Sequence, residues 1–79
     1  MIGFILINAV PEYEHEIYIE LLKISGVIEV HSLVGEYALI AKVEFQDVTE
    51  LGEIILNKIK TMKGVLCTKT LLWAVRSEK

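Results

Sequence analysis

The chain has 79 residues, of which 53% are hydrophobic and 24% are charged, and its formal net charge is −3. This length predicts one domain, residues 1–79, and the composition excludes a disordered tail, which needs low hydrophobicity and high net charge. The acidic balance argues against direct nucleic-acid binding, because proteins that neutralise phosphates are usually basic. The single cysteine, Cys67, excludes an internal disulfide and a cysteine-based zinc site within one chain.

Membrane and export signals are absent from the sequence. No apolar run reaches the roughly 18 residues that a transmembrane helix needs, and the start has no basic segment followed by a small-residue cleavage site. We therefore expect a cytoplasmic protein without a membrane partner. A domain this short and this apolar has no disulfide or metal to stabilise it, so we expect it to bury apolar surface against another copy.

The first half of the chain predicts a strand, a helix and a second strand. Residues 2–10 are almost wholly apolar and rich in β-branched side chains, which favours a strand covered on both faces. Pro11 stands where proline commonly begins a helix, and Gly26 is typical of the position just after a helix ends. Residues 27–34 then form the second predicted strand.

The second half predicts a strand, a helix and a final strand. Gly35 begins a tight connection to the strand at residues 37–45, which makes an antiparallel hairpin. Asp47 begins a D-x-x-E capping pattern at the start of the second helix, which is expected to end at a glycine. That helix is expected to carry, on one face, Val48, Leu51, Ile55, Ile59 and Met62. Residues 65–75 alternate as the last strand, and residues 76–79 are expected to be a frayed tail.

The order strand, helix, strand, strand, helix, strand is typical of the ferredoxin-like βαββαβ arrangement, an α+β fold. We expect a four-stranded antiparallel sheet with the first and third strands in the centre and both helices on one face. The first strand is apolar on both sides, so the other face of the sheet needs a cover. We expect a second sheet to provide it, which gives a homodimer of the dimeric α+β barrel type that assembles further into rings.

The residues with reactive side chains give little support for an enzyme. His15 lies among glutamates at a helix start, where no third ligand supports a metal site. His31 is expected to be a polar surface or interface residue, Cys67 has no paired base, and Trp73 is expected to fill a core or an interface. No phosphate-loop, dinucleotide-binding or hydrolase motif is present. We therefore predict no catalytic residue, no metal and no cofactor.

Two segments combine hydrogen-bonding groups with apolar neighbours. The backbone amides of the Gly35-Glu36-Tyr37 turn can hold a carboxylate, and the hydroxyls of Thr68 and Thr70 can hold polar atoms. An ordinary hairpin turn and β-favouring threonines explain the same residues. The pattern by itself leaves both interpretations open.

Taken in order, these segments resemble the Lrp/AsnC family, and more narrowly its C-terminal ligand-binding domain, the RAM domain (regulation of amino acid metabolism). The resemblance covers residues 2 to 75. It includes an amphipathic second helix and rests on three short motifs: Val27-Ile28-Glu29-Val30, Val34-Gly35-Glu36-Tyr37, and Gly64-Val65 with Thr68-Lys69-Thr70.

The resemblance implies a non-catalytic effector-binding module in transcriptional regulation. Domains of this family form dimers through their sheets and often octamers, and a free amino acid or related metabolite binds between dimers. The ligand-binding residues that the resemblance implies are Val34, Gly35, Tyr37, Ala38, Thr68 and Thr70. Ile54 and Lys58 of the second helix would select among ligand side chains.

Two departures from the family bear on function. Ala38 stands where the pattern G-x-Y-D has an aspartate, so a carboxylate that could fix an ammonium group is missing. The sequence begins at the first strand, so we expect a stand-alone form without the helix-turn-helix, which senses a metabolite or assembles with a full-length Lrp/AsnC regulator. Two alternatives remain: a purely structural partner of such a regulator, which Ala38 favours, and a small dimeric α+β barrel enzyme that uses His31 and Trp73.

Overall fold

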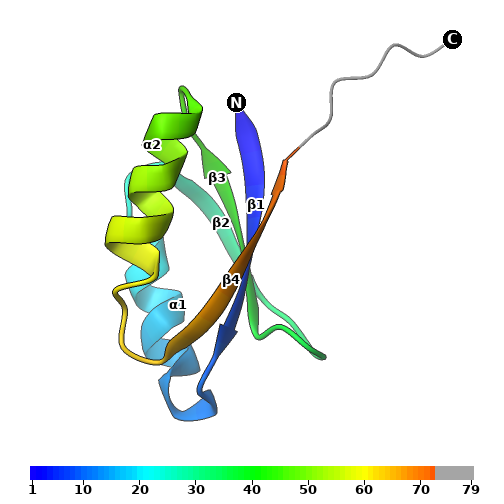
Figure 1. Ribbon diagram of the computed structural model, residues 1–79. Coiled ribbons are helices and arrows are strands. Elements are labelled where there is room, and N and C mark those ends of the chain that lie inside the picture. Colours follow the sequence, from blue (N-terminus) through cyan, green and yellow to red (C-terminus); the bar gives the residue numbers. More distant parts are fainter. Residues whose placement is uncertain (73–79) are drawn as a thin grey trace, which may run out of the picture.

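The computed structural model describes residues 1–72, which form a four-stranded antiparallel sheet with two helices (Figure 1). The strands are β1 (Ile2–Ala9), β2 (Val27–Ser32), β3 (Leu39–Glu44) and β4 (Val65–Leu72). Their order in the sheet is β2-β3-β1-β4. The first and third strands are therefore central, and the predicted ferredoxin-like fold is confirmed.

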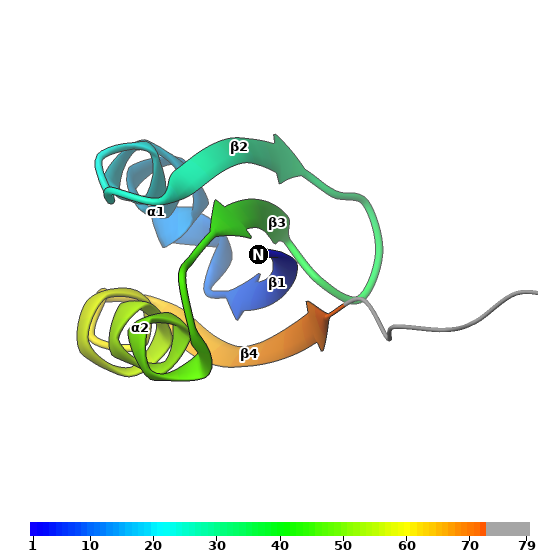
Figure 2. The same ribbon diagram turned by 90° about the horizontal axis from the view of Figure 1, so that it is seen from above.

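Both helices cover the same face of the sheet (Figure 2). α1 (Glu14–Leu22) follows a short 3-10 turn (Pro11–Tyr13) and lies beside β2. α2 (Val48–Glu53) lies beside β4 and continues as a π-helix (Ile54–Ile59). Within residues 1–72, the helices are too short and too polar to cross a membrane.

Alternation along the central strands decides which side chains the helices cover. Ile5 and Ile7 of β1 are fully buried, and they lie opposite Ala41 and Leu39 of β3. Side chains opposite one another share a sheet face, so these residues form the floor of the core. The buried apolar residues are Ile5, Ile7, Ala9, Ile17, Leu21, Val30, Leu39, Ala41, Val43, Phe45, Leu51, Ile54 and Ile59.

The capping pattern predicted at the start of α2 is present. The Oδ1 atom of Asp47 accepts a hydrogen bond of 2.8 Å from the backbone N–H of Glu50. The Oε1 atom of Glu50 accepts a bond of 2.6 Å from the backbone N–H of Gln46, the residue before the cap. Two backbone donors are thereby satisfied, which explains why the helix begins where the sequence predicts.

The second helix departs from the regular α-helix that its apolar spacing predicts. Between Ile54 and Ile59 the turns widen, and the N–H of Lys60 donates to the carbonyl of Ile55, five residues earlier, at 2.8 Å. A helix with wider turns keeps no single apolar stripe of 3.6-residue period. Of the residues predicted to share one face, Leu51 and Ile59 are buried, whereas the side chain of Val48 is 66% exposed.

Several element ends also differ from the prediction. β2 ends at Ser32 and β3 begins at Leu39, so residues 33–38 form a longer connection than the predicted tight turn. The N–H of Ala38 donates to the carbonyl of Ile7 at 2.9 Å, which ties the end of this connection to β1. The predicted continuation of the last strand through Trp73 to Val75, and the predicted tail, lie outside the described residues.

Candidate functional site

The connection between β2 and β3 projects beyond the sheet on the side away from the helices (Figure 1). Of the ligand contacts predicted here, Val34 and Gly35 are exposed, while Tyr37 and Ala38 are half-buried. Gly35 has a φ of +134°, and within residues 1–72 nothing but its own chain neighbours lies within 4 Å of the position that its Cβ would take. Backbone conformation rather than crowding therefore favours glycine at this position.

The two predicted threonine contacts lie on a different surface. Thr68 and Thr70 of edge strand β4 lie opposite Ile7 and Ile5 of β1. Because opposed residues share a sheet face, both threonines lie on the helix side, whereas the turn projects on the other side. In the sheet order, β1 also lies between β4 and β3. One copy of the chain does not bring the turn and the threonines together, so a site that uses both needs a second copy.

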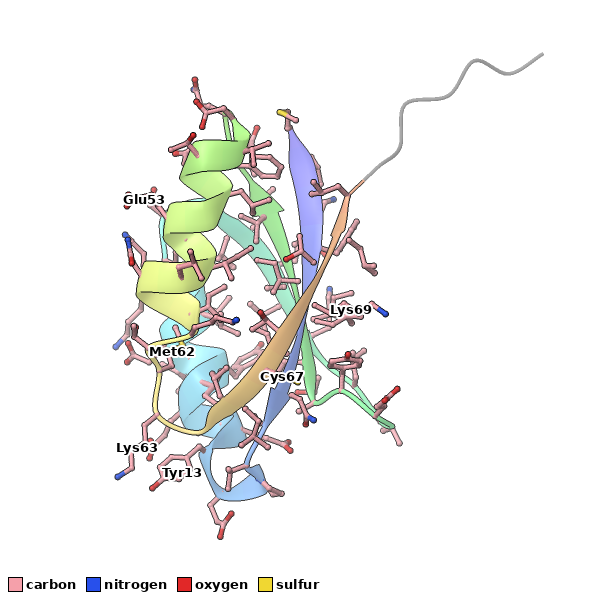
Figure 3. All side chains as sticks on the ribbon, in the orientation of Figure 1. Tyr13, Glu53, Met62, Lys63, Cys67 and Lys69 are labelled. Atoms are coloured by element: carbon pink, nitrogen blue, oxygen red, sulfur yellow. The ribbon has the colours of Figure 1, made fainter. Side chains whose placement is uncertain are left out.

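In residues 1–72 no element covers the sheet face away from the helices, and the centre of that face is apolar. Its central residues form two cross-strand rows: Ile40, Leu6 and Lys69, then Lys42, Phe4 and Leu71. Lys69 points away from the helices (Figure 3). These side chains are half-buried or exposed in the single copy. An apolar centre of this kind, flanked by charges, suits burial against another sheet.

An ion cluster lies at the β2 side of the uncovered face. The Nε2–H of His31 donates to Oε1 of Glu29 at 3.0 Å, and Nζ of Lys42 lies 3.9 Å from Oε2 of Glu29. The hydrogen bond from His31, followed by the charge of Lys42, lowers the pKa of Glu29 below its ordinary value. The cluster therefore keeps a carboxylate ionised on an exposed sheet edge.

The structure brings both histidines to one hollow, although the sequence placed them on separate elements. The hollow is about 550 Å³ and lies between the start of α1 and the edge strand β2. Its lining residues are Pro11, Glu14, His15, Tyr18, Val30, His31 and Ser32. Among residues 1–72, no three His, Cys, Asp or Glu side chains are placed to hold a metal ion. Only the packing of α1 beside β2 could have revealed this grouping.

The residues predicted to select ligand side chains lie in the helix layer. Ile54 and Lys58 line a hollow of about 450 Å³ together with Glu50 and Glu53. Ile54 is only 4% exposed and belongs to the core. Because the turn projects on the opposite side of the sheet, a selecting role for these residues also requires a second copy.

Sequence comparison matches residues 2–74 to the family model described as the Lrp/AsnC ligand binding domain. The chain is 35% identical over 73 residues to the uncharacterized HTH-type transcriptional regulator PH1916 of Pyrococcus horikoshii. That match covers 89% of this chain and 49% of the relative. The chain thus spans about half the length of the curated relatives that it matches.

Solved structures share the fold. TTHA0845 from Thermus thermophilus is 32% identical, with a TM-score of 0.89 over 99% of this chain and 96% of that chain. The transcriptional regulator NMB0573 from Neisseria meningitidis, solved as a complex with L-Met, is 16% identical. Its TM-score is 0.81 over 96% of this chain and 52% of that chain, and at this identity the likeness shows the fold alone.

Proposed function

The chain belongs to the Lrp/AsnC ligand-binding domain family, as its sequence pattern predicted, and on this premise we propose that it is an oligomeric effector-binding module. Its homologues are transcriptional regulators. In this proposal the domain senses an amino acid or a related metabolite where dimers meet. It thereby modulates transcriptional regulation in the cytoplasm, alone or assembled with a full-length regulator, and it neither binds DNA nor catalyses a reaction itself.

The observation that supports this proposal is the location of the predicted contacts, which lie on two different surfaces of one copy. The turn projects from the uncovered side of the sheet, whereas Thr68 and Thr70 lie on the helix side of β4. A site shared between copies gives both groups a role, because the turn of one copy can meet the threonines of another. A ligand bound there stabilises the assembly in proportion to its differential affinity for the assembled state.

The chemistry of the two surfaces favours a small zwitterion. Backbone N–H groups of the turn can bind a carboxylate, and threonine hydroxyls can accept hydrogen bonds from an ammonium group. Because Ala38 has no carboxylate, the threonines become the main candidates for binding the ammonium group. The complex of NMB0573 with L-Met supports testing amino acids first.

The proposal is tested by measuring melting temperature and sedimentation with each of the twenty amino acids. We expect at least one to raise the melting temperature and to shift the assembly state. The double variant Thr68→Ala/Thr70→Ala should bind that amino acid about tenfold more weakly or worse, since each lost hydrogen bond contributes about 1 kcal/mol.

The matched control is Thr61→Ala, an exposed threonine after the second helix, outside the turn, β4 and the hollow that Ile54 and Lys58 share. It should bind the amino acid as the wild type does. Unchanged affinity in the double variant would remove the threonines from the site. An oligomer indifferent to all twenty amino acids would instead favour a purely structural partner of a full-length regulator.

A second candidate function, a small dimeric α+β barrel enzyme, is favoured by one observation. The hollow between α1 and β2 is lined by His15, His31 and Ser32. Imidazole NMR signals distinguish the two functions. Shifts confined to His15 and His31 on adding a ligand would favour chemistry in the hollow, whereas unchanged imidazole signals under amino acid binding would favour the effector module.

A further inference from the structure

His31 lies on the uncovered sheet face, in line with the apolar centre of that face. In the strand register it is opposite Ile40, which in turn is opposite Leu6 of β1. Opposed residues share a sheet face, so the imidazole stands at the β2 end of a cross-strand row. The row ends on β4 at Lys69, which points away from the helices (Figure 3). The side chain of His31 is 64% exposed in the single copy, so a second sheet packed on this face would remove water from it.

The ion cluster at His31 has one carboxylate for two basic groups. Glu29 accepts the hydrogen bond from His31 at 3.0 Å, and Nζ of Lys42 lies 3.9 Å from the other oxygen of the same carboxylate. Within residues 1–72 no other carboxylate pairs with either basic group. While the imidazole is neutral, the charges of Glu29 and Lys42 balance one another. A proton on His31 therefore leaves the cluster with a surplus positive charge.

Other titratable groups of residues 1–72 lie on this face or beside it. They are Glu44 on β3, Cys67 and Lys69 on β4, Glu36 and Tyr37 in the connection after β2, and Glu14, His15 and Tyr18 of α1, which line the hollow beside β2. Histidine is the side chain whose charge ordinarily changes between about pH 5 and about pH 8. The lowered pKa of Glu29 keeps that carboxylate ionised across the same range. The two histidines are therefore the groups that an experiment must separate.

We propose that His31 is a pH-sensitive switch of the sheet-to-sheet contact between copies: the neutral imidazole permits the contact, and the protonated imidazole weakens it. A neutral imidazole that is bonded to Glu29 loses its water at little cost, whereas an imidazolium brings a second cation beside Lys42 into the contact from each copy. The proton thus binds more readily to separated copies, so falling pH shifts the population toward them. The inference rests on the oligomeric part of the proposed function and adds a means of regulating it.

Sedimentation at constant ionic strength, at about pH 8 and about pH 5.5, tests the switch across most of the range in which histidine ordinarily gains its proton. We expect the dissociation constant of the wild type to rise about tenfold at the lower pH. His31→Gln stays neutral and keeps an N–H that can donate to Glu29, so it should associate equally well at both pH values. His31→Lys is charged at both and should associate weakly throughout. A wild-type constant that ignores pH, or the same rise in His31→Gln, would overturn the proposal.

The matched control is His15→Gln, which removes the other histidine of the chain, on α1. It should keep the wild-type response to pH, and a response lost in His15→Gln but kept in His31→Gln would overturn the assignment to His31. Circular dichroism of every variant at both pH values excludes loss of fold as the cause. A wild type that is monomeric at the higher pH would overturn the oligomeric proposal itself, whereas an oligomer that ignores pH would overturn this inference alone.

Discussion

The carboxylate of Glu29 illustrates how single residues act on the exposed side of the sheet. Alternation along β2 places Glu29 and His31 on one face, and strand pairing brings Lys42 of β3 opposite Glu29. The two partners lie at 3.0 Å and 3.9 Å from the carboxylate oxygens. Solvent screens all three groups, so the cluster orients side chains at the rim of the face more than it stabilises the fold.

The lowered pKa of Glu29 predicts one feature of acid unfolding. A carboxyl group with a lowered pKa contributes stability above its ordinary value, 4.5, and loses it as the pH falls through the lower folded value. We therefore expect Glu29→Gln to flatten the fall in stability measured by urea unfolding between about pH 6 and about pH 3. Glu44→Gln, at an exposed carboxylate on β3, is the control. A slope as steep in Glu29→Gln as in the wild type would contradict the assignment.

At the level of elements, the second helix combines a strong start with an irregular second half. Asp47 caps it, whereas the wider turns between Ile54 and Ile59 interrupt the regular α-helical pattern. The regular portion, Val48–Glu53, is only six residues long, which is too short to be stable alone. Its stability therefore depends on the cap and on burial of Leu51 and Ile54 against the sheet.

The cap should make a measurable contribution to folding. Asp47→Ala removes the acceptor of the Glu50 N–H and should lower the free energy of unfolding by about 1 kcal/mol in chemical denaturation. Asp47→Asn keeps an acceptor oxygen at the same position and should lose much less. Equal losses in the two variants would show that the hydrogen bond is not the source of the effect.

For the whole molecule, the main feature is that both helices lie on one side of the sheet. Within residues 1–72, the other face of the sheet is therefore left without a cover. Phe4 and Leu6 of the central strand β1 point to that face, while Ile5 and Ile7 point to the core. A chain of this size gains stability by burying such a surface against another copy.

Leu6→Glu tests the face. A carboxylate at its centre would lose its hydration in a sheet-to-sheet dimer, so association should weaken about tenfold or more while the fold is kept. Sedimentation gives the mass, and circular dichroism confirms the fold. Leu56→Glu makes the same exchange at a side chain that is 60% exposed in the helix layer, and it should leave association unchanged. A dimer that tolerates Leu6→Glu would place the contact elsewhere.

The sequence alone determined the order of the elements, the two central strands and the start of the second helix at Asp47, because these follow from local periodicity, capping and the βαββαβ order. The family followed from the resemblance of its short motifs to the Lrp/AsnC domain. The sequence also indicated the candidate ligand contacts, which stay a prediction. Only the tertiary structure decided that Thr68 and Thr70 lie on the helix side, away from the turn, and that His15 and His31 share a hollow. The reason is physical: spacing encodes which face a residue takes on its own element, whereas contacts between elements depend on strand register and on how helices pack across the sheet.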